Sequence, residues 1–285
     1  MKFVRYGRNG HEQPGLVDAQ GRVRSLSGVV ADIDVSVFGP AGQRALRDIE
    51  ADSLPLVKGR PRLGVPVVGI SKFVAIGLNY RSHAEEAGMA IPTSPIVFNK
   101  WTTCISGPND AVLRPPGAQK LDWEVELGVV IGREARYVRE ADALKFVAGY
   151  CLVNDVSERA YQLEHGGQWN LGKGCDTFGP IGPWLVSANE IADPQNIDLW
   201  LDVNGERMQQ GNTRDMIFGV ASIVAHLSHY MTLLPGDVIA TGTPPGVGMG
   251  RKPPRYLQPG DVVTLGSPQL GVQRQEIRSA PQRPR

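Results

Sequence analysis

Two glutamates, Glu124 and Glu126, occupy alternate positions of the apolar stretch from Trp123 to Ile131. Side chains alternate between the two faces of a β-strand, so both carboxylates point to one face and the apolar residues to the other. Two carboxylates on one face repel each other unless a positive group lies between them. Their oxygens are the ligands that hard cations such as Mg²⁺ and Mn²⁺ prefer. The pattern predicts part of a metal site; the alternative is a half-buried strand with a solvated acidic face.

Asp155 is the candidate for a third metal ligand. It ends the apolar stretch from Phe146 to Asn154, where the sequence turns toward a helix. Functional residues are common at such strand ends. The alternative is that Asp155 caps the helix, with Glu158 closing a capping box three residues later. If the two strands are neighbours, the three carboxylates can converge on one ion.

His83 and Glu86 are the candidates for a general base and its partner. They lie three residues apart in a segment that begins with a possible capping residue, Ser82, and that predicts a short helix ending at Gly88. On a helix this spacing lets the carboxylate hydrogen-bond the imidazole and raise its basicity. Such a pair can activate a water molecule. The alternative is a solvated helix on which Glu86 has no role.

Lys173 lies between two glycines, which allow the backbone to approach a ligand closely. This setting predicts a lysine fixed at a binding site, against the alternative of an ordinary surface charge. The segment from Thr241 to Gly248 is rich in Gly and Pro and follows an apolar strand. It lacks the Gly-Lys-Ser/Thr ending of a phosphate loop, so we predict a substrate loop and no nucleotide site.

The composition excludes several classes of function. The chain has 285 residues, of which 41% are hydrophobic and 21% charged, as in ordinary globular enzymes. Its 30 Lys and Arg are balanced by 29 Asp and Glu, so the basic excess that nucleic-acid binding requires is missing. No apolar run approaches the roughly 18 residues of a membrane helix, and the N-terminus lacks a signal-peptide core. We expect a cytoplasmic protein that binds neither nucleic acid nor membranes.

The chain divides into two unequal parts. Its 34 Gly and 22 Pro favour many short strands joined by tight turns, so the expected fold class is α+β and rich in strands. Short strands and a segment of helical periodicity predict a small N-terminal domain over residues 1–70. A stretch rich in Pro, Gly and Val separates it from the larger domain, residues 71–285, which carries every candidate residue. The tail, residues 278–285, is predicted to be disordered.

Together these segments resemble the fumarylacetoacetate hydrolase family. The order and spacing match from about residue 71 to residue 276, in the motifs Gly77-Leu-Asn-Tyr-Arg-Ser-His83-Ala-Glu-Glu86, Glu124-Val-Glu126, Asn154-Asp155-Val-Ser-Glu-Arg159-Ala-Tyr-Gln162, Gly172-Lys173-Gly174 and Thr241-Gly-Thr243-Pro. The resemblance implies a catalytic domain with a mixed β-roll of packed sheets and short helices. It also implies a small N-terminal α/β domain, a homodimer, and one Mg²⁺ or Mn²⁺ ion in each active site.

The resemblance further implies a role for each candidate residue. The metal would be held by Glu124, Glu126 and Asp155. Water would be activated by His83 with Glu86, and negative charge would be stabilised by Lys173. The carboxylate and keto oxygens of the substrate would be held by Arg159, Gln162 and Thr243.

Within the family, the stretch from Gln168 to Val186 is most similar to the bacterial hydrolases of 2,4-diketo-3-deoxy sugar acids, which act in L-rhamnose or L-fucose breakdown. This implies hydrolysis of the C3–C4 bond of a diketo acid such as L-2,4-diketo-3-deoxyrhamnonate, giving pyruvate and lactate. Three alternatives stay open: decarboxylation of oxaloacetate or another β-keto acid, dehydration of a 2-keto-3-deoxy sugar acid, and a metal-stabilised binding protein without turnover. The dyad and Lys173 argue against the last, because a purely structural site needs neither a base nor a cation.

Overall fold

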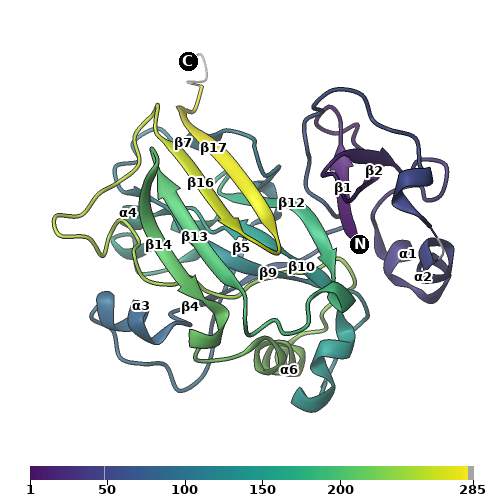
Figure 1. Ribbon diagram of the computed structural model, residues 1–285. Coiled ribbons are helices and arrows are strands. Elements are labelled where there is room, and N and C mark those ends of the chain that lie inside the picture. The colour runs from purple at the N-terminus through teal and green to yellow at the C-terminus, as the bar shows by residue number, and fades with distance from the viewer. Residues whose placement is uncertain (48, 282–285) are drawn as a thin grey trace.

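The computed structural model describes residues 1–47 and 49–281. Strands dominate this part of the chain, and its helices are short (Figure 1). The α-helices are α1 (Val35–Phe38), α2 (Pro40–Arg47), α3 (Arg81–Glu86), α4 (Arg159–Leu163), α5 (Asn170–Lys173) and α6 (Val220–Tyr230). Single 3₁₀ turns or short 3₁₀ segments cover Ala51–Ser53, Thr102–Cys104, Glu140–Phe146, Ala188–Glu190 and Thr213–Asp215. None of the described helices has both the length and the hydropathy needed to cross a lipid bilayer.

The largest sheet runs through the middle of the described structure. Its strands are, in spatial order, β3 (Val23–Ser25), β2 (Gln13–Val17), β1 (Lys2–Tyr6), β12 (Gly179–Ser187), β10 (Val147–Asn154), β9 (Val125–Ile131), β15 (Val238–Ala240), β4 (Phe73–Gly77) and β5 (Ile96–Lys100), with β6 (Ile105–Ser106) beside β12. The pairs β15–β4 and β12–β6 are parallel and the others antiparallel, so the sheet is mixed. The predicted α+β, strand-rich class is therefore confirmed.

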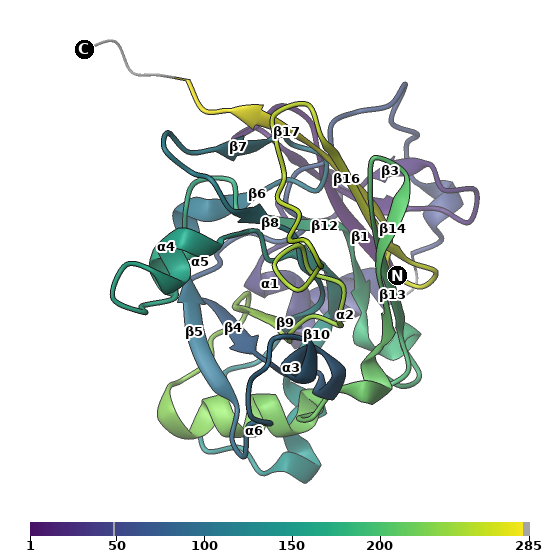
Figure 2. The ribbon, with the colours of Figure 1, turned by 90° about the vertical axis from the view of Figure 1, so that its left-hand side faces the viewer.

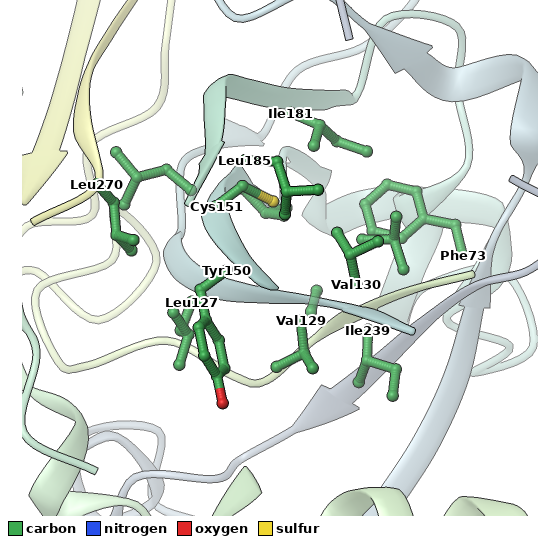
Figure 3. Close-up of a cluster of buried hydrophobic side chains, with 14 of the residues drawn as sticks. Phe73, Leu127, Val129, Val130, Tyr150, Cys151, Ile181, Leu185, Ile239 and Leu270 are labelled. Carbon is green, nitrogen blue, oxygen red and sulfur yellow. The ribbon is translucent and has the colours of Figure 1, made fainter. Parts of the chain in front are cut away.

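A second sheet packs against the centre of the first. Its strands are, in order, β14 (Glu206–Asn212), β13 (Asp198–Val203), β16 (Val262–Ser267), β17 (Gly271–Ser279) and β7 (Val112–Arg114). A two-stranded ladder joins β8 (Leu121–Asp122) to β11 (Ser157–Glu158). Strands β9 and β10 contact β13, β16 and β17 of the second sheet. Every residue of β9 is buried, so both of its faces are covered, and Figure 3 shows its side chains among those of β4, β10, β12 and β15.

The N-terminal strands extend the large sheet. Strand β1 pairs with β12 through Lys2 opposite Val186 and Phe3 opposite Leu185. Figure 1 shows this N-terminal part at one side of the molecule, with α1 and α2 next to β1 and β2. The segment before residue 71 is thus joined to the rest by main-chain hydrogen bonds, and the domain boundary at residue 70 stays a prediction.

Two details of the structure differ from the sequence predictions. The N-cap of α3 is Tyr80 and not Ser82, because a β-bridge with Met216 holds Tyr80 extended up to the start of the helix. The start of the tail that the sequence predicts to be disordered belongs to β17, since Arg278 and Ser279 pair with β7, a strand distant in sequence. Residues 282–285, the end of the tail, lie outside the described residues.

Candidate active site

Three carboxylates meet at the edge of the sheet where β9 begins and β10 ends. Because the two strands are antiparallel, with Asn154 opposite Val125, the residue before β9 lies next to the residue after β10. The amide of Asp155 donates to the carbonyl oxygen of Glu124 at 2.9 Å. One carboxylate oxygen from each of Glu124, Glu126 and Asp155 lies within 4.8 Å of the others.

All three carboxylates are buried, at 5%, 1% and 0% exposure for Glu124, Glu126 and Asp155. The alternative of a solvated acidic face is therefore wrong. The alternative role of Asp155 as a helix cap is also wrong, because Glu158 caps α4 and accepts from the amide of Ala160.

Two lysines neutralise part of this negative charge. Lys173, the last residue of α5, donates from Nζ to Glu124 Oε2 and to Asp155 Oδ2, both at 2.7 Å. Lys100, the last residue of β5, places its Nζ 2.6 Å from Asp155 Oδ1 and also donates to the carbonyl oxygen of Lys173. Figure 2 shows β5 beside α4 and α5, the elements that carry the basic residues of the site.

Arg159 opens α4 and is almost fully buried. Its Nε donates to Asp122 Oδ2 at 2.8 Å and its Nη2 to Glu124 Oε1 at 2.6 Å. Its Nη1 donates to Gln162 Oε1 at 3.0 Å. A guanidinium has five N–H groups, so two remain for a ligand.

The cations are distributed unevenly over the carboxylates. Burial opposes ionisation of Glu124, but Lys173 and Arg159 outweigh it and lower the pKa of Glu124 to about 2. Burial together with the charges of Asp155 and Glu124 raises the pKa of Glu126 well above its usual value. Glu126 accepts from the amide of Gly242 at 2.7 Å, and no ion pair joins it to a cation of the described residues.

This donor set fits a hard divalent cation. It offers converging carboxylate oxygens, the ligands of Mg²⁺ and Mn²⁺, and no sulfur or imidazole ligand. The two lysines and the arginine form no ion pair with Glu126, so its negative charge is the one that is not compensated. A dication between the three carboxylates would supply that compensation and favour the ionised form of Glu126.

The predicted dyad is formed on α3. His83 Nδ1 lies 3.2 Å from Glu86 Oε2. Both carboxylate oxygens of Glu86 also accept from the amide of Gly246, at 3.0 and 3.1 Å. The loop packs closely here, since a Cβ on Gly250 would come within 2.5 Å of the Glu86 carboxyl carbon. Glu86 is thus held by the loop from Thr241 to Gly248 and in turn orients the imidazole, so the alternative of an idle Glu86 on a solvated helix is wrong.

A cavity of about 220 Å³ brings most of these groups together. Its polar lining consists of His83, Glu124, Glu126, Arg159, Gln162, Lys173 and Thr243. The Thr243 hydroxyl donates to the carbonyl oxygen of Val125 at 2.9 Å and accepts from Gln209 Nε2 at 2.8 Å. A larger cavity of about 610 Å³, next to α1 and α2, contains none of the candidate residues. The candidate residues therefore lie at the smaller cavity.

Three buried polar residues of the site are absent from the sequence predictions: Lys100, Asp122 and Gln209. The Asp122 carboxylate accepts from Arg159 and from the amides of Gly248 and Met249, at 2.6 and 3.0 Å. It thereby joins α4 to the loop that contains Gly248 and Met249. The only signal for Asp122 in the sequence was its position directly before the apolar stretch that begins at Trp123.

Comparison with known proteins agrees with this geometry. The sequence model described as "Fumarylacetoacetate (FAA) hydrolase C-terminal" matches residues 72–278. The chain belongs to this family.

Individual relatives cover almost the whole chain. A Burkholderia lata protein that carries only the general name of a hydrolase is 58% identical over 281 residues, which are 98% of this chain and 100% of that protein. The structure of fumarylacetoacetate hydrolase from Exiguobacterium antarcticum is 34% identical with a TM-score of 0.86, over 98% of this chain and 100% of its own. The structure of maleylpyruvate hydrolase from Sphingobium sp. SYK-6, solved with manganese(II) and pyruvate, is 28% identical with a TM-score of 0.81, over 99% of this chain and 100% of its own.

Proposed function

We propose that the protein hydrolyses the C3–C4 bond of a 2,4-diketo acid and releases pyruvate. The observation that carries this proposal is the meeting, in one cavity, of three converging carboxylates with the His83 imidazole and the Lys173 ammonium. A cation site, a base and a fixed positive charge are the three groups that this reaction needs.

The metal of the proposal is Mg²⁺ or Mn²⁺, held by Glu124, Glu126 and Asp155. When bound, it would act as a Lewis acid that polarises the 2-keto group. The manganese(II) and pyruvate in the related maleylpyruvate hydrolase support both the ion and the α-keto acid.

The substrate head is oriented by α4 and by the substrate loop. Arg159 has two N–H groups left after its bonds to Asp122, Glu124 and Gln162, and we assign them to the C1 carboxylate. The Gln162 side-chain amide, whose oxygen accepts from Arg159, keeps its N–H₂ group for a substrate oxygen. Thr243 forms the wall of the cavity next to these groups.

The base of the proposal is His83. If Nδ1 donates to Glu86, Nε2 is unprotonated and takes a proton from water. The water oxygen adds to C4, the C3–C4 bond breaks, and its electron pair stays on C3 and the C2 oxygen as the enolate of pyruvate. His83 returns this proton to C3, which completes pyruvate, and the carboxylic acid formed at C4 loses its own proton to become the second carboxylate.

Lys173 stabilises the developing negative charge. Two of its three N–H groups donate to Glu124 and Asp155, and the third remains for a substrate oxygen. The buried ammonium acts at low dielectric, where such a contact is stronger than in water.

The dyad favours hydrolysis over decarboxylation, because loss of carbon dioxide from a β-keto acid needs no activated water. Within the diketo acids we propose a 2,4-diketo-3-deoxy sugar acid, such as L-2,4-diketo-3-deoxyrhamnonate, and a homodimer as the active form. Light scattering on the purified protein tests the homodimer.

The experiment is a panel of 2,4-diketo acids and β-keto acids assayed with added Mg²⁺ or Mn²⁺. Release of pyruvate together with a second carboxylic acid is the expected result. Carbon dioxide release from oxaloacetate, with no cleavage of any diketo acid, would replace hydrolysis with decarboxylation.

A further inference from the structure

We propose that the cavity selects 2-oxo acids with an uncharged tail that ends in an apolar group, and rejects those with a second carboxylate. This inference rests on the proposed function, whose α-keto acid head occupies the polar end of the cavity. It concerns the other end, where the tail of the substrate must lie.

The wall that faces the tail is apolar. Every polar side chain that lines the cavity is already assigned to the metal cluster, to the dyad, to the substrate head or, for Lys173, to the developing negative charge. The rest of the lining consists of Gly77, Ala87 and seven large apolar side chains: Ile76, Leu78, Met89, Phe98, Leu163, Trp169 and Met249. These side chains come from β4, β5, α4 and the loops that follow β4, α3, α4 and β15, so an apolar surface surrounds the tail on several sides.

The aromatic part of this wall is fixed. Trp169 and Phe98 form an edge-to-face pair with ring centroids 5.4 Å apart. A Cβ on Gly77 would come within 2.3 Å of the Trp169 ring, so the indole packs directly on the backbone of β4. Lys173 Nζ lies 5.2 Å from the centroid of the Phe98 ring. The same ring therefore lies close to the Lys173 ammonium and also lines the cavity.

No cation of the described lining is available for a second carboxylate. Arg159 and Lys173 are the lining residues with a permanent positive charge, and both donate to the buried carboxylates of the cluster. Glu124 and Glu126 add negative charge to the same small volume. A second carboxylate would lose its hydration against apolar side chains without gaining a partner, whereas an alkyl end gains from the same contact.

The open end of the wall consists of Met89 and Leu163, which are 51% and 46% exposed. Met89 follows α3, and Leu163 is the last residue of α4. Substitution of either side chain changes the tail region without disturbing the buried cluster, because each is half in solvent.

The test compares two six-carbon acids, 2-oxohexanoate and 2-oxoadipate, which differ only in a terminal methyl or carboxylate. Neither has a C4 keto group, so binding is measured without cleavage. Calorimetric titration of the Mn²⁺-loaded protein should give an affinity for 2-oxohexanoate at least about tenfold higher than for 2-oxoadipate. Shortening the alkyl acid should weaken binding by about fourfold for each methylene lost.

Matched variants locate the effect. Met89→Lys should raise the affinity for 2-oxoadipate about tenfold or more relative to 2-oxohexanoate, because it places a cation at the mouth. Met89→Gln, which introduces a polar but neutral side chain, should weaken the binding of 2-oxohexanoate without raising the affinity for 2-oxoadipate. Leu163→Lys repeats the measurement from α4 if the Met89 variants fold poorly.

Equal binding of the two acids, or tighter binding of 2-oxoadipate, overturns the tail proposal and leaves the proposed function intact. Failure of both acids to bind overturns both proposals, since the head would then not be recognised. Clear preference for 2-oxohexanoate without any cleavage of diketo acids supports the tail proposal and contradicts the hydrolysis.

Discussion

Two regions of the molecule use the same chemical pairs, an arginine or lysine with a carboxylate, in different surroundings. Around the active site the paired side chains are at most 6% exposed, in the pairs Lys100–Asp155, Lys173–Glu124, Arg159–Asp122 and Arg159–Glu124. In the N-terminal region several pairs include a partner that is 26% exposed or more, as in Arg5–Asp32, Arg24–Asp52 and Arg62–Asp110. The pairs Arg5–Glu12 and Arg24–Asp18 of the same region are more buried, at 11% exposure or less.

The difference shows what each set of charges can do. Pairs in contact with water are screened and contribute little to stability. Buried pairs cost desolvation, and removal of one partner leaves a charge that nothing compensates. The N-terminal pairs therefore fasten one segment to another, whereas the buried pairs maintain a cluster of carboxylates that would otherwise repel or protonate.

The largest expected effect is on metal binding. Glu126→Gln keeps the shape of the side chain and removes the charge that no ion pair offsets. Loss of a residue that only hydrogen-bonds a metal ligand lowers metal affinity by roughly 10- to 100-fold. Because Glu126 is a proposed ligand itself, the affinity for Mn²⁺ should fall by more than this, and turnover should be lost. Calorimetry on chelator-treated protein measures this, with Glu12→Gln in the N-terminal region as the control. An unchanged affinity in Glu126→Gln would show that the cluster does not hold the metal.

The next effect separates metal binding from water activation. His83→Ala should lower kcat by about 10²- to 10⁴-fold, since it removes the proposed general base. Its affinity for Mn²⁺ should stay as in the unchanged protein, because His83 is not among the converging carboxylates. Steady-state kinetics and calorimetry measure the two quantities, and normal cleavage by the variant would refute the assigned role.

A third effect is on stability. Lys100→Met removes the buried partner of Asp155 Oδ1, and should lower the free energy of unfolding by about 3 kcal/mol. Urea unfolding followed by circular dichroism measures it. Lys100→Arg keeps the charge and should recover part of the loss. If Lys100→Met is as stable as the unchanged protein, the pair is not needed to compensate Asp155.

The smallest effect belongs to the N-terminal region. Arg62→Met removes pairs with Glu12 at 2.8 Å and with Asp110 at 2.6 Å, and the side chains of Arg62 and Asp110 are 29% and 28% exposed. The free energy of unfolding should fall by about 1 kcal/mol, and high salt should reduce the difference. Mn²⁺ affinity should not change. A loss as large as that of Lys100→Met would remove the distinction between the two regions.

Local periodicity indicated the acidic part of the site but left other interpretations open. Alternation from Glu124 into β9 puts Glu124 and Glu126 on one face, and the end of an apolar strand marks Asp155. The order and spacing of the motifs along the chain then indicated the family. Lys100 and Asp122 could not be predicted in this way, because each acquires its importance from a contact with a residue far away in sequence, Asp155 and Arg159.

Two of the longer strands are hard to predict from the sequence, for different reasons. Strand β12 contains Pro180 and Pro183, which lack the N–H that a sheet uses and so argue against a strand. Strand β14, which carries Gln209, has little apolar alternation. It did have a signal, because Asn204 and Gly205, both with positive φ, form the kind of tight turn that connects hairpin strands.

The pairing of β1 with β12 has a consequence for any shortened form of the protein. The family match begins only at residue 72, which suggests that the preceding segment could be removed. A chain that starts there would leave the backbone of Leu185 and Val186 without its neighbour and uncover their apolar side chains. Exposed strand edges recruit other chains, so such a fragment should aggregate although its catalytic groups are all present.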